Sequence, residues 1–281
     1  MATPSSGTIS VGQIDTEFKI TNSPYGLDIL GMATFSKYSS PYAMNDFYNK
    51  SFAAGITSGL LIYIDAAHPD SGGGSTWYDV SGNGNHYSGG GTFGTGAYGG
   101  YYSFGGGSSK GGNGINVAST HTTEIWVRPQ AGQSMYSTFC AGSSRYAGLN
   151  GVGYAVKPLN MATSGGAGSG IAVGTNGAQL IAHSADYIPI LAQYSYSFST
   201  STFYQVVGVW SGNVPYLYIN GTLYDSGCAA DRTTYANMAQ IGAADYGYYT
   251  GDMSIMRHWN RALSGSEITT LYNFTKTRYG L

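Results

Sequence analysis

The chain has 281 residues, a formal net charge of -2 at pH 7 and only 9% charged residues, against 44 glycines and 26 tyrosines. An ordinary soluble protein carries about 25% charged residues, so this surface must consist largely of Gly, Ser, Thr, Asn and Tyr. Without a basic excess the chain does not attract nucleic acid, which excludes a DNA-binding role. No apolar run approaches the roughly 18 residues of a membrane helix, which excludes insertion into a membrane.

The N-terminal sequence MATPSSGTIS lacks the basic and apolar regions of a signal peptide. We therefore expect a protein that is made in a cytoplasm and is not exported by the standard route. Cys140 and Cys228 are the only cysteines. They could pair across two sheets, but a reducing compartment favours two free buried thiols.

Residues 1–56 contain most of the sequence compatible with helices, at residues 13–19 and 42–52. Aromatic residues such as Phe18 and Phe47 give this segment more apolar surface than a free tail would carry. Two interpretations remain open, an arm packed on the main domain and a separate docking module. We divide the chain into a partly helical docking or assembly arm, residues 1–56, and a main domain, residues 57–281.

The predicted strands of the main domain begin at residues 60–65 (LLIYID), an apolar run of strand length. Residues 77–86 alternate Gly and Asn and predict a compact turn. In the glycine-rich stretch that follows, residues 101–104 are the expected strand. Residues 124–128 (EIWVR) predict another strand, which ends at Pro129.

The middle of the chain is less regular. We predict strands at residues 137–141, 153–156 and 171–174, and a flexible turn at residues 164–170. The apolar run at residues 179–183 should pair with the strand before it.

Residues 204–224 predict a β-meander. One β-prone run covers residues 204–210 and the next covers residues 216–219, followed by Asn220-Gly221, a dipeptide that suits a two-residue type I′ turn. An isolated hairpin is only marginally stable in water, so this one predicts a larger sheet. Residues 238–243 and 253–259 are the predicted closing strands of the domain.

One helix is predicted in the main domain, at residues 264–274 (SGSEITTLYNF). Ser264 or Ser266 can cap its N-terminus, and Ile268 with Leu271 begins an apolar stripe at helical spacing. About a dozen short strands and one terminal helix predict an all-β sandwich.

Catalytic and metal-binding patterns are missing from the sequence. A glycoside hydrolase needs two carboxylates at a fixed separation, whereas the only glutamates are Glu17, Glu124 and Glu267, in unrelated segments. The five histidines show no H-x-x-x-H or H-x-H spacing, so zinc is not expected. We expect a protein that is not an enzyme, with a hydrolase as the least favoured alternative.

The turn at residues 77–86 leaves a structural calcium ion open. Asp79, Asn83 and Asn85 carry the hard oxygen ligands that calcium prefers. The same residue types form turns through hydrogen bonds to their own backbone. We favour the turn and keep a calcium site near Asp79 and Asn83 as the alternative.

Glycan binding requires exposed aromatic rings and neutral hydrogen-bonding groups. The tyrosine-rich segments at residues 98–102 and 246–250 fit this requirement, because tyrosine combines a rigid apolar face with a polar tip. The alternative is that these tyrosines pack on sheet edges or neighbouring subunits. The candidate ligand-binding residues are Tyr98, Tyr101, Tyr246, Tyr248 and Tyr249.

Five segments in order resemble the concanavalin A-like lectin/glucanase superfamily, in its laminin G-like branch. They are LLIYID at 60–65, WYDVSGNGN at 77–85, EIWVRP at 124–129, YLYING at 216–221 and GDMSIMRHWNRALSGSEI at 251–268. The resemblance spans about residues 58–275. It implies a jelly roll of two antiparallel sheets that binds glycans or proteins and often carries calcium.

The N-terminal segments 7–18 and 42–48 look like those of bacteriophage structural proteins, notably of phages that infect cyanobacteria. This resemblance implies a virion protein attached to other virion proteins through residues 1–55. We expect a tail or baseplate fibre, or fibre tip, that binds host-surface glycan as a homo-oligomer, a trimer if it is a fibre. The alternative is a capsid decoration or cement protein with a lectin-like jelly roll.

Overall fold

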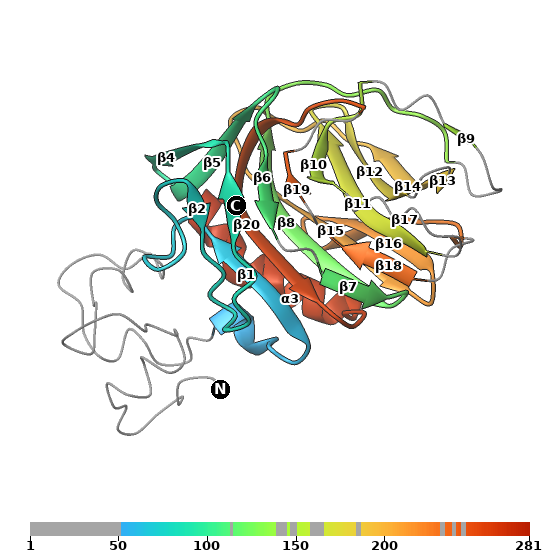
Figure 1. Cartoon of the computed structure of the whole chain (residues 1–281), viewed down its shortest axis with the longest axis horizontal. Coiled ribbons are helices and arrows are strands. Elements are labelled where there is room, and N and C mark those ends of the chain that lie inside the picture. The colour runs from blue at the N-terminus through green and yellow to red at the C-terminus, as the bar shows by residue number, and fades with distance from the viewer. Residues whose placement is uncertain are drawn as a thin grey trace.

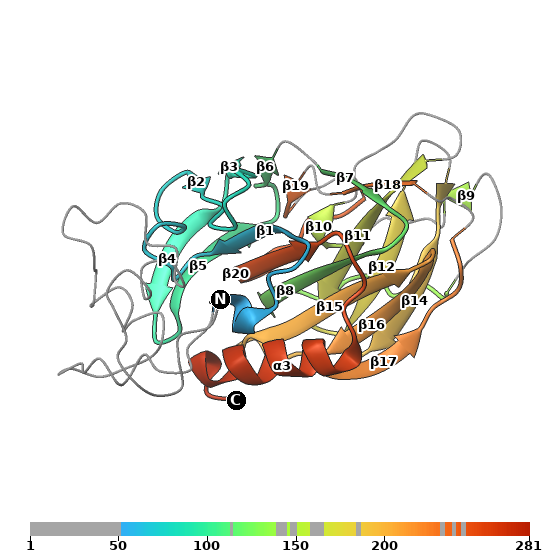
Figure 2. The same ribbon diagram turned by 90° about the horizontal axis from the view of Figure 1, so that it is seen from below.

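The computed structural model describes residues 52–112, 115–138, 145–146, 151–157, 166–183, 187–230, 234–237, 240–242 and 246–281. Two β-sheets pack face to face, and a helix near the C-terminus covers one of them (Figures 1 and 2). The prediction of an all-β, two-sheet jelly-roll sandwich with a short C-terminal helix is confirmed. The predicted helices of the N-terminal arm lie outside the described residues, which begin with a 3-10 turn, η2 (Phe52–Gly55).

The first sheet is antiparallel throughout its described strands. These strands are β1 (Leu60–Asp65), β4 (Thr92–Gly96), β5 (Gly99–Gly105), β8 (His121–Pro129), β15 (Tyr204–Ser211), β16 (Val214–Ile219), β17 (Thr222–Ser226) and β20 (Thr250–Trp259). Their order is β17-β16-β15-β8-β20-β5-β4, and β1 also pairs with β20. Strands far apart in sequence, β8 and β20, therefore form its centre.

The second sheet is mostly antiparallel. Its described strands are β2 (Thr76–Trp77), β3 (Tyr87–Gly89), β6 (Lys110–Gly112), β7 (Ile115–Ala118), β10 (Tyr154–Lys157), β11 (Gly166–Gly174), β12 (Gly177–His183), β14 (Ile190–Ser195), β18 (Thr234–Asn237) and β19 (Gln240–Ile241). Their order is β14-β12-β11-β10-β19-β6-β3-β2, and β18 joins β11 in parallel and β7 in antiparallel pairing. A separate parallel pair joins β9 (Arg145–Tyr146) to β13 (Tyr187–Ile188).

The predicted β-meander is confirmed as β15, β16 and β17. Ile219 pairs with Thr222 across a two-residue turn, and its central residues have positive φ angles, 50° at Asn220 and 78° at Gly221. This is the backbone that a type I′ turn requires. The strands predicted around residues 60–65, 124–128 and 253–259 also form, and they lie side by side in the first sheet.

The prediction of a flexible turn at residues 164–170 is wrong over the described part of that segment. Residues 166–170 belong to β11, which pairs with β12 on one side and with β10 and β18 on the other. Glycine weakens an isolated strand, but neighbouring strands supply the pairing here, so tertiary context overrides the local preference. Of the strand predicted at 137–141, residues 137–138 are exposed loop and the rest lies outside the described residues.

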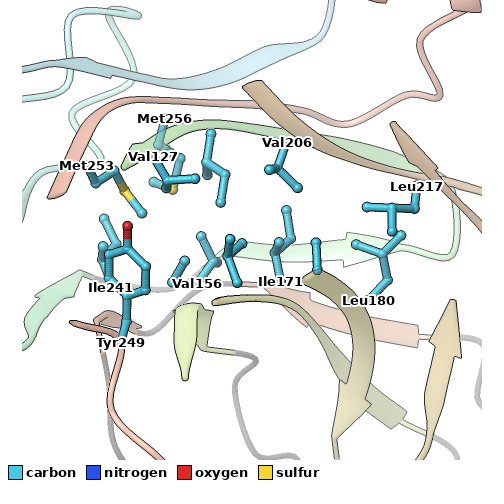
Figure 3. Packing of buried hydrophobic residues seen from close by; sticks show 14 of the residues in the cluster. Val127, Val156, Ile171, Leu180, Val206, Leu217, Ile241, Tyr249, Met253 and Met256 are labelled. Atoms are coloured by element: carbon cyan, nitrogen blue, oxygen red, sulfur yellow. The ribbon is translucent and has the colours of Figure 1, made fainter. Parts of the chain in front are cut away.

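The main hydrophobic core lies between the two sheets (Figure 3). Side chains from the first sheet, such as Val127 and Met256, face side chains from the second, such as Val156 and Ile171. Alternate residues of each strand enter this layer, because successive side chains of a strand point to opposite faces.

The outer face of the first sheet is covered by α3 (Gly265–Thr275) and the 3-10 turn η3 (Lys276–Tyr279) (Figure 2). Of the two caps that the sequence allowed, Ser264 is the one that forms, in a capping box with Glu267. The ring of Tyr279 stacks on that of Trp126 with centroids 4.6 Å apart. The helix therefore seals a second apolar layer against the sheet. Among the described residues, no helix is long and apolar enough to span a bilayer.

A buried row of charged and polar side chains crosses the sheet beneath this helix. Arg257 Nη1 lies 2.9 Å from Glu124 Oε2, and both side chains are fully buried. Glu124 Oε1 also accepts hydrogen bonds from Trp126 Nε1 at 3.0 Å and Gln205 Nε2 at 2.8 Å. The glutamate thus has donors on every side, which compensates for the loss of its hydration.

The same row continues to the C-terminal segment. Arg278 of η3 donates to both carboxylate oxygens of Asp65, at 2.8 Å each, and Tyr63 donates to Asp65 at 3.2 Å. Burial alone would raise the pKa of Asp65, but the charge and hydrogen bonds of Arg278 hold the pKa below its usual value. Asp65 therefore stays ionised and fastens the chain end to β1.

Two buried histidines lie between the sheets. His121 Nε2 lies 2.8 Å from Ser169 Oγ of the second sheet, and its ring stacks on Trp210 at 4.7 Å. His258 Nδ1 lies 2.9 Å from Thr123 Oγ1. Burial, together with the neighbouring His121, holds the pKa of His258 well below its usual value.

Replacing Glu124 by Gln should cost about 3–5 kcal/mol of unfolding free energy, because it leaves Arg257 charged and buried without a counterion. Urea unfolding monitored by tryptophan fluorescence measures this loss. The control is Arg261→Gln in the Arg261–Glu267 pair, which is about 30% exposed and should cost about 1 kcal/mol or less. Equal losses in the two variants would contradict the assignment of the buried row as a main stabilising contact.

Stability should fall as pH drops from 7 to 5. In the unfolded chain His258 binds a proton near its ordinary pKa of about 6.5, whereas in the folded chain its pKa is well below that value. The unfolded state therefore binds more protons below about pH 6.5, and each such group removes up to about 1.4 kcal/mol per pH unit. Urea titrations at several pH values should show a shallower fall of the unfolding free energy for His258→Gln than for the wild type.

Candidate functional site

The outer face of the second sheet carries its own apolar cluster, formed by Val152, Tyr154, Ala172, Ile181, Ile188 and Ile190. Along β12, Leu180 enters the core between the sheets, so its neighbours Gln179 and Ile181 point to the outer face. Tyr136 and Tyr246 pack against this outer cluster and remain partly exposed. The result is an aromatic surface over β10, β11 and β12.

The segment at residues 246–249 is fixed against the start of β10. Gly151 N donates to Tyr246 O at 2.5 Å, and Tyr248 forms an isolated parallel bridge with Tyr154. A Cβ on Gly153 would lie 2.8 Å from the carbonyl oxygen of Tyr248, so only a glycine permits this close approach. Backbone pairing, not side-chain contact alone, sets the position of these tyrosines.

Tyr246 brings the aromatic surface into contact with the polar side chain of His183. Its hydroxyl lies 3.4 Å from His183 Nε2, and its ring meets the His183 ring edge-on with centroids 5.8 Å apart. Tyr248 is 52% exposed. Tyr246 therefore packs against the sheet, while Tyr248 exposes its ring to solvent.

Gln179 supplies a further polar group beneath this surface. Its side chain is fully buried, and its Nε2 donates to the backbone oxygen of Tyr136 at 3.4 Å. Within the described part of the chain its Oε1 accepts no hydrogen bond, which is uncommon for a buried polar atom. We call Tyr136, Tyr246 and Tyr248, with His183 and Gln179, the outer tyrosine site.

The five tyrosines predicted from the sequence do not form one site. Tyr246 and Tyr248 belong to the outer tyrosine site, but Tyr249 is fully buried, and its hydroxyl donates to Asp252 O at 2.9 Å. Figure 3 shows its ring within the core between the sheets. The prediction that Tyr249 is an exposed ligand contact is therefore wrong, because residue 249 faces inward where its neighbours do not.

The other two candidates lie against the helix-covered face of the first sheet. Tyr98 packs on Phe203 and Tyr279, with centroids 6.0 and 5.8 Å away. The guanidinium of Arg128 lies over the ring of Tyr101, 5.2 Å from its centroid. Both tyrosines are partly exposed, and their role in ligand binding stays a prediction.

The sequence offered no signal for Tyr136, His183 and Gln179. Tyr136 lies in a loop, whereas Gln179 and His183 lie in β12. These segments meet residues 246–248 only because the strands of the sheet pair. Because side chains alternate between the two faces of a strand, residues 179–183 would have placed Gln179 and His183 on the same face. The sequence does not show which other segment lies over that face.

The described glutamates occupy structural positions. Glu124 is paired with Arg257 under the helix, and Glu267 caps α3 and accepts hydrogen bonds from Arg261. These hydrogen bonds lower the pKa of Glu267 to about 2, whereas a general acid needs a raised pKa. Glu17 lies outside the described residues.

Asp79 forms a turn and does not fit a calcium site. Its Oδ1 accepts from Tyr63 N at 2.8 Å and Ser81 N at 2.9 Å, and its Oδ2 accepts from Ser81 Oγ at 2.8 Å and Asn85 N at 2.9 Å. Asn83 Nδ2 donates to Leu60 O at 3.0 Å. Donors therefore surround the oxygens that calcium would need. Among the described residues, no group of three His, Cys, Asp or Glu side chains could hold a metal ion.

Cys228 is disulfide-bonded, so the expectation of free buried thiols is wrong for this residue. The chain has one other cysteine, Cys140, which lies outside the described residues.

Comparisons with solved structures show the same fold at low sequence identity. Domain 4 of AbnA, an extracellular arabinanase from Geobacillus stearothermophilus in complex with arabinotriose, is 17% identical with a TM-score of 0.51, over 76% of this chain and 98% of that one. The binding domain of paraclostridial mosquitocidal protein 1 is 15% identical with a TM-score of 0.52, over 76% and 52% of the two chains. The binding domain of botulinum neurotoxin DC in complex with SialylT is 12% identical with a TM-score of 0.50, over 78% and 52%.

The chain thus spans about half the length of the two toxin binding domains. A sequence search among curated proteins found no match. A family model for the concanavalin A-like lectin/glucanases superfamily matches residues 100–269, a region that runs from β5 to α3 and includes the centres of both sheets. The chain belongs to this superfamily.

Proposed function

We propose that the chain binds carbohydrate without altering it chemically, and that the outer tyrosine site is the binding surface. The observation that carries this proposal is the grouping of partly exposed tyrosine rings over the second sheet, above the buried polar side chains of His183 and Gln179. Sugar rings offer apolar C–H faces and many hydroxyls, so they suit tyrosine rings beside neutral donors and acceptors.

Two structural relatives support a sugar as the ligand. The arabinanase domain is in complex with arabinotriose, and the neurotoxin binding domain is in complex with SialylT. The fold therefore accommodates sugars in proteins of very different sequence. The proposal assigns the same class of ligand to this chain.

Binding without catalysis agrees with how the described carboxylates are used. Glu124 and Asp65 are paired with buried arginines, and Glu267 caps a helix. A glycoside hydrolase would need two carboxylates about 5–10 Å apart at the sugar, and the outer tyrosine site as described contains none.

We further propose that the protein is displayed on a bacteriophage particle, as a tail or baseplate fibre or fibre tip that binds host-surface glycan. Residues 1–55 would attach it to other virion proteins, since segments 7–18 and 42–48 look like phage structural proteins. The disulfide at Cys228 suits a virion surface, where thiols meet oxidising conditions. A capsid decoration protein is the alternative.

Tyr248→Ala should weaken glycan binding about tenfold, roughly 1.4 kcal/mol, because it removes an exposed ring and leaves the core untouched. Binding is measured on an array of immobilised bacterial surface polysaccharides and neutral and sialylated oligosaccharides. The matched control is Tyr78→Ala, which removes a tyrosine that is 46% exposed elsewhere on the molecule and should bind as the wild type does. Equal binding by both variants would remove the outer tyrosine site from the proposal.

Deleting residues 1–55 should abolish attachment to phage particles and leave glycan binding intact. Co-sedimentation with particles measures attachment, and thermal melting checks the remaining domain. A fibre should form stable trimers and bind host cells, whereas a decoration protein should bind empty capsids in numbers set by capsid symmetry. Attachment by the shortened chain would contradict the docking role of the arm.

A further inference from the structure

A second group of tyrosines gathers where the edges of the two sheets meet. β14 is the edge strand of the second sheet and β17 that of the first, and the two strands are in contact. The rings of Tyr194 in β14 and Tyr224 in β17 lie 4.5 Å apart between centroids. Tyr196 lies 5.7 Å from Tyr224 and 6.0 Å from Tyr204. We call these four residues the edge tyrosine cluster.

A β-bulge places Tyr224 in this cluster. Leu217 pairs with Asp225, but the next residue of β16, Tyr218, pairs with Leu223, so Tyr224 is an extra residue on β17. Leu223 is exposed, whereas Tyr224 packs against the core between the sheets. A bulge redirects a side chain in this way, and here it turns a tyrosine toward β14.

The edge tyrosine cluster packs against the core on one side and is exposed to solvent on the other. Tyr196, Tyr204 and Tyr224 pack against the core between the sheets. Phe198 is buried and lies 4.7 Å from Tyr196 and 5.0 Å from Tyr204 between ring centroids. Tyr194 remains 38% exposed. Rings held in place in this way lose little conformational entropy when a ligand binds.

The chain that leaves β17 holds the two edges together. Cys228 N donates to Leu191 O of β14 at 2.9 Å, and Gly227 N donates to Pro215 O of β16 at 2.8 Å. A Cβ on Gly227 would lie 2.3 Å from Leu191 O, so only glycine can make this crossing. The edge tyrosine cluster is therefore formed before any ligand arrives.

The segment of the chain that carries the cluster is almost without charge. Between residues 187 and 230 the only charged residue is Asp225, whose Oδ2 accepts from Gln193 N at 2.8 Å. Residues 195–202 (SYSFSTST) add a row of hydroxyls. Burial raises the pKa of Tyr196, and the nearby hydroxyls of Tyr224 and Tyr204 add to this. The four phenol groups lie close together, and a phenol hydroxyl can both donate and accept a hydrogen bond.

We propose that the edge tyrosine cluster is a second carbohydrate-binding surface, which takes uncharged sugar rings of a polysaccharide. The rings of Tyr194 and Tyr224 meet the apolar faces of the sugar, and the phenol and serine hydroxyls exchange hydrogen bonds with its hydroxyls. The carboxylate of Asp225 disfavours acidic sugars at this surface. The inference rests on the proposed carbohydrate binding but names a different surface and a narrower class of ligand.

The test measures binding of the full chain to surfaces coated with dextran, mannan or galactan as neutral probes and polysialic acid as the acidic probe. Tyr194→Ala should lower the affinity for a neutral polysaccharide about tenfold, and Tyr194→Phe, which keeps the ring, should retain most of it. Tyr248→Ala should keep residual binding that the Tyr194→Ala/Tyr248→Ala double variant loses. Thr222→Arg places a large charged side chain at an exposed position of β17, two residues from Tyr224, and should also weaken binding without removing a ring of the cluster.

Four results would overturn the inference. If Tyr194→Ala and Thr222→Arg bind as the wild type does while Tyr248→Ala does not bind, the outer tyrosine site alone carries the function. If only polysialic acid is bound, the ligand class is wrong. If no coated surface is bound although the glycan array of the earlier test is, this inference fails and the proposed function stands. If Tyr194→Ala lowers the molar mass in light scattering without changing binding, the cluster is a contact between copies of the chain.

Discussion

The ion pair between Glu124 and Arg257 is the contact on which the arrangement of this molecule depends. It joins the two central strands of the first sheet, and its row of partners reaches β1 through Tyr63 and the chain end through Asp65 and Arg278. Charges without water are stable only when every one has a partner. Strands and helix must therefore come together in one register, because any other register would leave a buried charge alone.

Because some of the few charged side chains are buried, the surface of the molecule carries few charges. Only 9% of the residues in the chain are charged, and two ion pairs, Glu124–Arg257 and Asp65–Arg278, are buried beneath α3 and η3. Much of the outside is left to Tyr, Ser, Thr, Asn and Gly. Such a surface offers few charges to a ligand. It can hold a ligand through ring faces and short neutral hydrogen bonds, which are the interactions that sugars offer.

The two tyrosine surfaces are built differently. The outer tyrosine site lies over one sheet, where residues 246–248 run along β10 and Gln179 lies beneath. The edge tyrosine cluster lies between two sheets and depends on a bulge and a glycine crossing. In both, the backbone fixes the rings, so binding would order little of the protein. Two separated surfaces on one module would also raise avidity for a polymer of repeated sugars.

Local sequence determined the elements whose side chains specify their own geometry. The Asn220-Gly221 turn, the Ser264–Glu267 capping box and the Asp79 turn each depend on residues close in the chain, and apolar runs such as 60–65 mark strands in any context. Only the tertiary structure decided that glycine-rich residues 166–170 form a central strand, that Tyr249 points inward, and that Tyr194 meets Tyr224. Those outcomes depend on strand pairing and on a bulge, in which one extra residue turns a side chain to the opposite face of the strand. The strands that pair are distant in sequence, so their pairing leaves no local sequence pattern.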